Sequence, residues 1–110
     1  MTPEDRLALL ATDHPFRFDD GMYATNDHGL KFWITGRDTA ELDVGDMTVE
    51  IAIEPAIRED GTAGRYVYPA AIDVWKDGTP LSDAERTALL TIIPKAIEAS
   101  GEFVIIAGSD

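Results

Sequence analysis

Apolar and polar residues alternate one for one along much of the chain between residues 16 and 53. The alternating segments are 16–18, 22–24, 30–34, 40–44 and 47–53, and turn sequences such as Asp19-Asp20-Gly21 and Gly45-Asp46 separate them. In a β-strand, successive side chains point to opposite faces of the sheet. The pattern therefore predicts short antiparallel strands in a sheet with one buried face and one solvent face.

The residues before and after this alternating region predict further elements. A short helix is expected from Thr2, which caps it, to His14-Pro15, which ends it. Another strand is expected over residues 65–75, where Pro69 indicates an edge strand or a bulge. A last short strand is expected over residues 103–107. Strands thus follow one another through short turns before and after a second, longer helix.

That longer helix has a clear start. Ser82-x-x-Glu85 is a capping box, and the helix is expected to run to about Ser100. Its apolar residues recur at helical spacing over 89–97, which gives one side to pack on the sheet. Pro94 stands inside this stripe and is expected to kink or split the helix, because proline lacks the amide hydrogen that the helix needs.

We therefore expect one domain, residues 1–110, of the α+β class. Its mostly antiparallel sheet has five to seven strands, with one long C-terminal helix packed on one face and a short N-terminal helix. The 45% hydrophobic content agrees with a globular domain. The chain contains no cysteine, which excludes disulfides, thiolate zinc sites and thiol catalysis.

The charge balance narrows the classes of partner. The chain carries 9 Lys and Arg against 21 Asp and Glu, a net charge of −12. This charge repels phosphates, so it argues against direct binding to nucleic acid or to an anionic membrane surface. The apolar runs fall far short of the roughly 20 residues of a membrane span, and the polar first residues do not form a signal sequence. We expect a cytoplasmic protein.

No arrangement of nucleophile and base emerges from the sequence. The serines stand at a helix cap and beside the last strand, and no Gly-x-Ser-x-Gly turn occurs. His14 and His28 lie beside turns and lack a metal-binding spacing. Asp27 and His28 are adjacent and form a conceivable acid–base pair, although a solvated turn histidine is the favoured interpretation. We expect no catalytic residues, and hence not an enzyme.

Metal and cofactor binding find equally little support. Asp43-x-x-Asp46 flanks a glycine turn and offers two carboxylates to a hard cation, but it matches no calcium-loop pattern. Residues 59–64 contain two glycines without the Lys-Ser/Thr of a phosphate-binding loop. We expect neither a metal nor a cofactor.

The polar face of the predicted sheet is the most informative surface. It carries Lys31, Trp33, Glu41, Asp43, Glu50, Glu54, Asp73 and Trp75. Aromatic anchors surrounded by carboxylates suit a basic protein partner, and an acidic field speeds the encounter. The candidate partner-binding residues are Trp33, Glu41, Asp43, Glu50 and Trp75. Alternatively, each tryptophan covers a neighbouring strand or packs under the N-terminal helix, and the acidity serves solubility.

Lys31 and Arg37 are the cations near this face. They are expected to set the register of a complex, because a cation within an acidic surface admits only a matching arrangement of charges on the partner. The sequence leaves open whether the protein is a monomer or a dimer. Exposed edge strands favour self-pairing, and the high net charge opposes it.

The C-terminal part of the chain resembles a known family. The segment Ile72-Asp73-Val74-Trp75, the Gly78-x-Pro80 turn and the apolar helix opened by Ser82-x-x-Glu85 are similar to small bacterial immunity proteins of polymorphic toxin systems, most nearly the immunity protein 74 family. The likeness covers about 40 residues, 66–106. It implies a non-enzymatic inhibitor that binds a cognate toxin, and it supplies no catalytic residues.

Two hypotheses of different class follow. The first is an acidic immunity protein that occludes the active site of a basic toxin or effector. The alternative is a small ligand-binding or accessory domain of bacterial or phage origin, with a pocket between helix and sheet lined by Tyr66, Tyr68 and Trp75. A substitution of Trp33 or Trp75 that weakens binding without loss of stability would favour the first.

Overall fold

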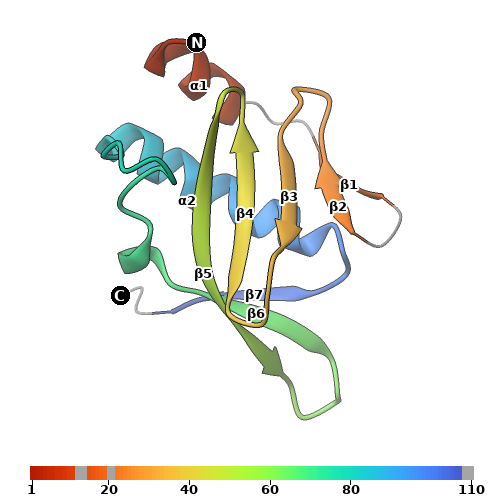
Figure 1. Cartoon of the computed structure of the whole chain (residues 1–110). Helices are drawn as coiled ribbons and strands as arrows, with labels where there is room; N and C mark the ends of the chain where they lie inside the picture. The colour runs from red at the N-terminus through yellow and green to blue at the C-terminus, as the bar shows by residue number, and fades with distance from the viewer. Residues whose placement is uncertain (12–14, 20–21, 108–110) are drawn as a thin grey trace.

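The computed structural model describes residues 1–11, 15–19 and 22–107. The helices are α1 (Pro3–Leu10) and α2 (Asp83–Glu98), with a 3-10 turn, η1 (Pro69–Ala71); the strands are β1 (Arg17–Asp19), β2 (Tyr23–Thr25), β3 (Lys31–Ile34), β4 (Thr39–Val44), β5 (Met47–Ile57), β6 (Ala63–Val67) and β7 (Phe103–Ile106). The predicted α+β fold with a short first helix is confirmed (Figure 1). The expected helix end at His14, the turn at Asp20-Gly21 and Ser109 lie outside the described residues.

The described strands form one seven-stranded sheet in the order β1 to β7. The pairs from β1 to β6 are antiparallel, and β7 runs parallel to β6 because α2 carries the chain back between them. In Figure 1, α2 passes behind β3, β4 and β5. The sheet therefore has an inner face, on the side of α2, and an outer face, which we define as the side of β1–β5 opposite α2.

The inner face and α2 form the hydrophobic core. Cross-strand register joins Ala24, Phe32, Leu42 and Val49 over four strands, and all four side chains are buried. The helix contributes Leu89, Ile92, Ile93, Ala96 and Ile97. Burial of apolar surface is the dominant favourable term in folding, so this layer fixes which side of each strand faces outward.

Strand β5 changes partners along its length. Residues 47–52 pair with β4, and residues 53–57 pair with β6. Pro55 lies in the second half, beyond the residues that pair with β4. Its lack of an amide hydrogen therefore costs no hydrogen bond to β4. The change of partner curls the sheet, and the β5–β6 hairpin extends below the rest of it in Figure 1.

The prediction of one strand over residues 65–75 is wrong. β6 ends at Val67, and Pro69 begins η1, because its fixed φ and missing amide hydrogen suit the first position of a helical turn. After η1 the buried side chains are Ile72 and Trp75, three residues apart rather than two. Pro94 lies inside α2 and does not split it.

Candidate protein-binding face

The outer face presents two rows of side chains that cross the strands. The first row contains Asp19, Tyr23, Trp33, Glu41 and Glu50, and the second contains Arg17, Thr25, Lys31, Asp43 and Thr48. Each row residue is paired directly with the next across the strand boundary. No described helix covers these rows (Figure 1). Four of the five predicted binding residues, all except Trp75, thus lie side by side as the alternation indicated.

Two aromatic rings and a cation form the centre of this face. The rings of Tyr23 and Trp33 meet edge to face, with centroids 6.0 Å apart and an angle of 72°. Lys31 Nζ lies 3.9 Å from the Tyr23 centroid and 5.8 Å from that of Trp33. Lys31 is therefore held by cation–π attraction over the rings. All three side chains are half-buried, so each leaves surface for a partner.

The carboxylates of the outer face differ in how open they are. Glu41 is buried and accepts a 2.6 Å hydrogen bond at Oε2 from Lys76 Nζ. Asp43 accepts a 2.6 Å hydrogen bond from Thr48 Oγ1. Glu50 is exposed. The negative charge of the outer face is therefore partly neutralised at Glu41, by Lys76, and is exposed at Glu50.

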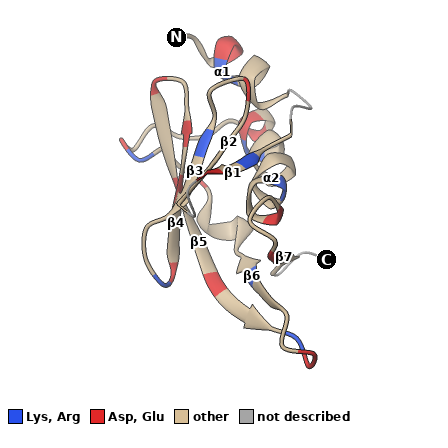
Figure 2. Ribbon diagram, turned by 90° about the vertical axis from the view of Figure 1, so that its right-hand side faces the viewer, with Lys and Arg blue, Asp and Glu red and all other residues tan. Residues whose placement is uncertain are grey.

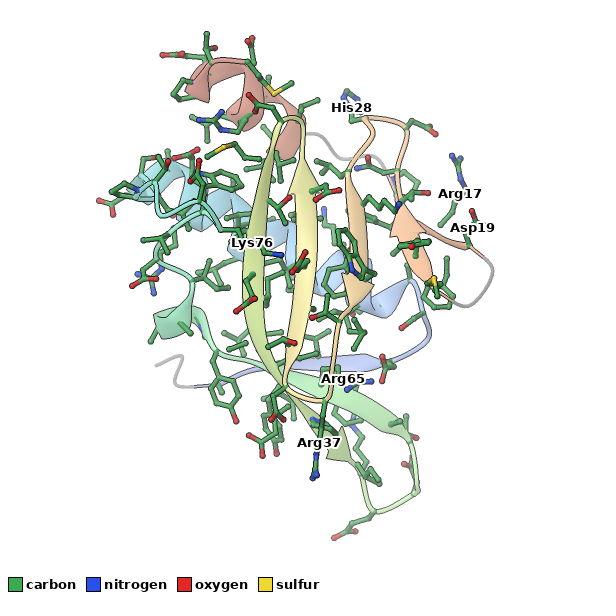
Figure 3. All side chains as sticks on the ribbon, in the orientation of Figure 1. Arg17, Asp19, His28, Arg37, Arg65 and Lys76 are labelled. Carbon is green, nitrogen blue, oxygen red and sulfur yellow. The ribbon has the colours of Figure 1, made fainter. Side chains whose placement is uncertain are left out.

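Lys76 is a member of this face that sequence reasoning missed. Its side chain reaches over β5 toward β4 in Figure 3. The hydrogen bond and charge of Glu41 raise the pKa of Lys76 above its ordinary 10.5, and the charges of Glu50 and Asp43 add to this effect. Because Lys76 and Glu41 are far apart in sequence, no local pattern signals their contact.

The segment 74–80 positions this lysine. Its backbone folds back on itself, with Trp75 N donating to Thr79 O at 2.8 Å. Lys76 N donates to Thr48 O at 2.8 Å, which fastens the segment along the free side of β5. Within the turn, Asp77 accepts a hydrogen bond from Thr79 N at 2.9 Å, and this bond lowers the pKa of the Asp77 carboxyl.

Trp75 is the predicted binding residue that the structure removes from the surface. Its side chain is only 1% exposed, so the expectation that it lies on the solvent face beside Trp33 is wrong. The guanidinium carbon of Arg6, on α1, lies 5.5 Å from the Trp75 ring centroid. The physical reason is the end of β6 at Val67, which breaks the alternation and lets the chain pass under α1. The structure instead agrees with the alternative given above for Trp75, which is packing under the N-terminal helix.

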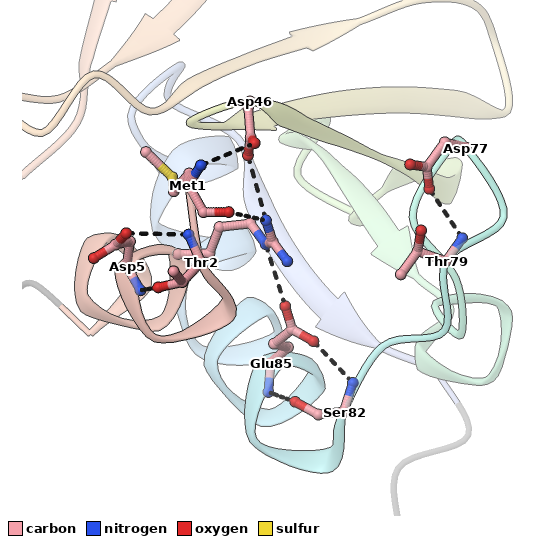
Figure 4. Close-up of polar contacts among 9 residues, drawn as sticks. Met1, Thr2, Asp5, Asp46, Asp77, Thr79, Ser82 and Glu85 are labelled. Carbon is pink, nitrogen blue, oxygen red and sulfur yellow. Dashed lines mark hydrogen bonds and ion pairs between the residues drawn. The ribbon is translucent and has the colours of Figure 1, made fainter.

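Arg6 joins three parts of the molecule around Trp75. It pairs with Glu85 of α2, Nε to Oε2 at 3.5 Å, and with Asp46 of the β4–β5 turn, Nη1 to Oδ1 at 3.3 Å (Figure 4). Arg6 and Glu85 are both buried, at 8% and 4% exposure. Glu85 also completes the predicted capping box with Ser82. This cluster fixes α1 on α2 and on the turn beside the outer face.

The remaining polar candidates are dispersed. Asp27 pairs with Arg17 Nη2 at 2.8 Å. Asp43 and Asp46 have separate partners, and the described residues contain no group of three or more His, Asp or Glu placed to hold a metal ion. Arg37 lies in the β3–β4 turn, at one end of the outer face (Figure 3). Acidic positions are spread over strands, helices and loops in Figure 2.

The predicted lining of a pocket between helix and sheet, Tyr66, Tyr68 and Trp75, is not what the structure shows. Tyr66 is paired with Glu54, and Tyr68 donates its hydroxyl to the same carboxylate. Val67, between them, is buried. Both tyrosines therefore face away from the core. The prediction that Tyr66, Tyr68 and Trp75 line a pocket between helix and sheet is wrong.

Within the described residues, every helix is too short or too polar to cross a membrane. Comparisons with family models, with curated proteins and with solved structures find no match to this chain.

Proposed function

We propose that this protein is a non-enzymatic inhibitor of the immunity-protein type, which neutralises a basic toxin by covering its active site with the outer face. The observation that carries the proposal is the half-buried Tyr23–Trp33 pair set in one row with Glu41 and Glu50, on a face that no described helix covers. Aromatic side chains beside charged groups are typical of the residues that dominate binding energy at protein interfaces.

The charge of the whole chain supports a basic partner. A net charge of −12 draws a positively charged protein toward the surface over a distance set by ionic strength. Enzymes that act on phosphate polymers are commonly basic at the active cleft, and the carboxylates of the outer face imitate the charge of their substrate. In this proposal the acidic field accelerates association, and the aromatic pair slows dissociation.

Lys31 and Lys76 give the face its pattern. Both cations lie among carboxylates, Lys31 beside Asp43 and Lys76 on Glu41. A partner with uniform positive charge would meet repulsion at both points. The cognate partner therefore presents a carboxylate or an aromatic ring opposite Lys31, which separates it from other basic proteins.

The first experiment is co-expression with the products of neighbouring genes in the source genome. We expect one basic protein that is toxic alone and tolerated together with this chain, and that forms a complex with it. Failure of every neighbour to be neutralised would contradict the immunity-type proposal.

Variants then place the interface. W33A and the charge reversal E50K are expected to weaken the complex at least tenfold, because they remove an anchor and an attractive charge from the outer face. E98K on α2 is the matched control, since Glu98 is also exposed and the net charge changes equally. Equal weakening by E50K and E98K would indicate a general charge effect and overturn the outer face as the binding site.

A further inference from the structure

A pocket of about 330 Å³ lies between the inner face of the sheet and the C-terminal part of α2. Its sheet wall is formed by the inward side of β1–β3 and by Arg65 of β6, and Trp33, a member of the first outer row, also lines it. Phe18, Met22, Phe32 and Ile34 supply apolar walls, and Arg65 and Glu102 supply the polar end. Its volume falls near the lower end of the range of small-molecule sites.

The pocket exists because the sheet extends further than the helix. α2 covers the middle of the inner face, where Phe32 is 4% exposed. Phe18 is in the same cross-strand row as Phe32, but it is 44% exposed, and Met22 and Ile34 are 60% and 38% exposed. Three large apolar side chains therefore gather at one opening, which is a feature of ligand-binding grooves rather than of scattered surface residues.

The polar end is electrically neutral. Arg65 Nε donates to Glu102 Oε2 at 3.1 Å, and both side chains are about one-fifth exposed. Ser100 Oγ donates to Ile97 O at 2.7 Å and lies 3.3 Å from Glu102 Oε1. Within the described chain the two Nη nitrogens of Arg65 have no hydrogen-bond partner. Free donors thus stand beside a carboxylate acceptor.

This arrangement selects a class of ligand. A charged ligand would compete with one member of the Arg65–Glu102 pair and leave the other partly buried without its partner, which is costly. A neutral group that both donates and accepts, such as an amide or a hydroxyl, bonds both members without separating them. The apolar walls take the rest of the molecule.

We propose that this pocket binds a small neutral molecule with an aromatic or branched aliphatic body and one amide or hydroxyl group at its polar end. The proposal does not rest on the partner proposed for the outer face, although Trp33 belongs to both sites. A ligand there covers Phe18 and Ile34 and joins β3 to the end of α2, where the fold itself leaves a gap.

Three probes of similar size test the proposal: benzamide, which is neutral, benzoate, an anion, and benzylamine, a cation. Each is titrated into the isotopically labelled protein, and backbone amide shifts are followed by NMR. We expect benzamide to shift the amides of Phe32, Ile34 and Ser100, and to bind at least fivefold more tightly than either charged probe. Benzoate or benzylamine binding as tightly as benzamide would overturn the neutral class of ligand.

Substitutions distinguish this pocket from any other apolar site. R65M is expected to weaken benzamide at least fivefold by removing the donor, and I34N to do so by removing an apolar wall. The second variant matters because R65M also breaks a contact between β6 and the residue before β7. E50K, on the outer face, should leave benzamide binding unchanged. Shifts confined to other residues, or none up to 10 mM probe, would overturn the site without affecting the outer-face proposal.

Discussion

Trp33 and Trp75 stand in two regions that use the same pair of groups in opposite ways. In each region a cation lies near the indole, Lys31 at 5.8 Å from Trp33 and Arg6 at 5.5 Å from Trp75. The first pair is half-open on a sheet face, and the second is enclosed by α1, α2 and the β4–β5 turn. Burial, rather than residue type, therefore decides whether such a pair stabilises the fold or remains available to a partner.

The largest expected effect comes from removing each indole in turn. W75A should lower the free energy of unfolding by about 3–5 kcal/mol, because it leaves a cavity in the core and a buried guanidinium without its ring. W33A should cost about 1 kcal/mol, mainly the lost edge-to-face contact with Tyr23. Urea denaturation of both variants measures the difference. Equal losses would contradict the contrast between the two regions.

A second, smaller loss is expected from the buried ion pair beside Trp75. E85Q keeps the capping box, because glutamine also accepts the hydrogen bond from Ser82 N. Among the described acidic side chains, it leaves the Arg6 guanidinium paired with Asp46 alone. We expect a loss of about 3 kcal/mol. E98Q, an exposed change on the same helix, is the control. If both variants unfold at the same urea concentration, the Arg6–Glu85 pair contributes little to stability.

The two regions also differ in how well sequence patterns predict them. Alternation over residues 30–53 places Trp33, Glu41 and Glu50 correctly, since short hairpins fix register locally and one buried face fixes the side of each residue. Trp75 follows Pro69 and η1, where no period continues, and its burial depends on α1, whose sequence lies far away. Local patterns therefore specify the outer face and leave the enclosed region undetermined.

Contacts distant in sequence account for the other omissions. The bond from Lys76 to Glu41 requires segment 74–80 to lie along β5, and nothing within that segment indicates where it will dock. The pocket beside Phe18 depends on the length of α2 relative to the width of the sheet. Such features arise from how elements fit together, which a pattern of a single element does not contain.

On the outer face, Glu41 and Glu50 differ in how strongly each affects the pKa of Lys76. The pKa of Lys76 is raised first by its hydrogen bond to Glu41 and then by the charges around it. E41Q should therefore bring this pKa down toward 10.5, whereas E50Q, which removes a more distant charge, should lower it less. Titration of the Lys76 side chain by NMR measures both shifts. An equal fall in the two variants would show that the summed field, and not the Glu41 bond, holds the proton.

The same raised pKa gives a small pH dependence with a definite sign. A group whose pKa is higher in the folded state stabilises the fold fully below its unfolded value, and this stabilisation is lost as pH rises through the folded pKa. Lys76 therefore contributes below pH 10.5 and loses its contribution above it, and Tyr68, whose pKa is raised by its hydrogen bond to Glu54, does the same above pH 10.0. Asp5, Asp60 and Asp77 act oppositely, because hydrogen bonds lower their pKa values, and they lose their contributions as pH falls below 3.8.

E41Q and Y68F separate the two alkaline contributions. Each variant should lose less stability than the native chain when urea denaturation at pH 9 is compared with that at pH 11, because one of the two titrating contacts is absent. The double variant should lose least. The buried Arg6 beside Trp75 is not expected to contribute to this alkaline loss, since arginine keeps its charge throughout this pH range. An alkaline loss that is unchanged in the double variant would mean that the Lys76–Glu41 and Tyr68–Glu54 contacts do not cause the loss of stability at high pH.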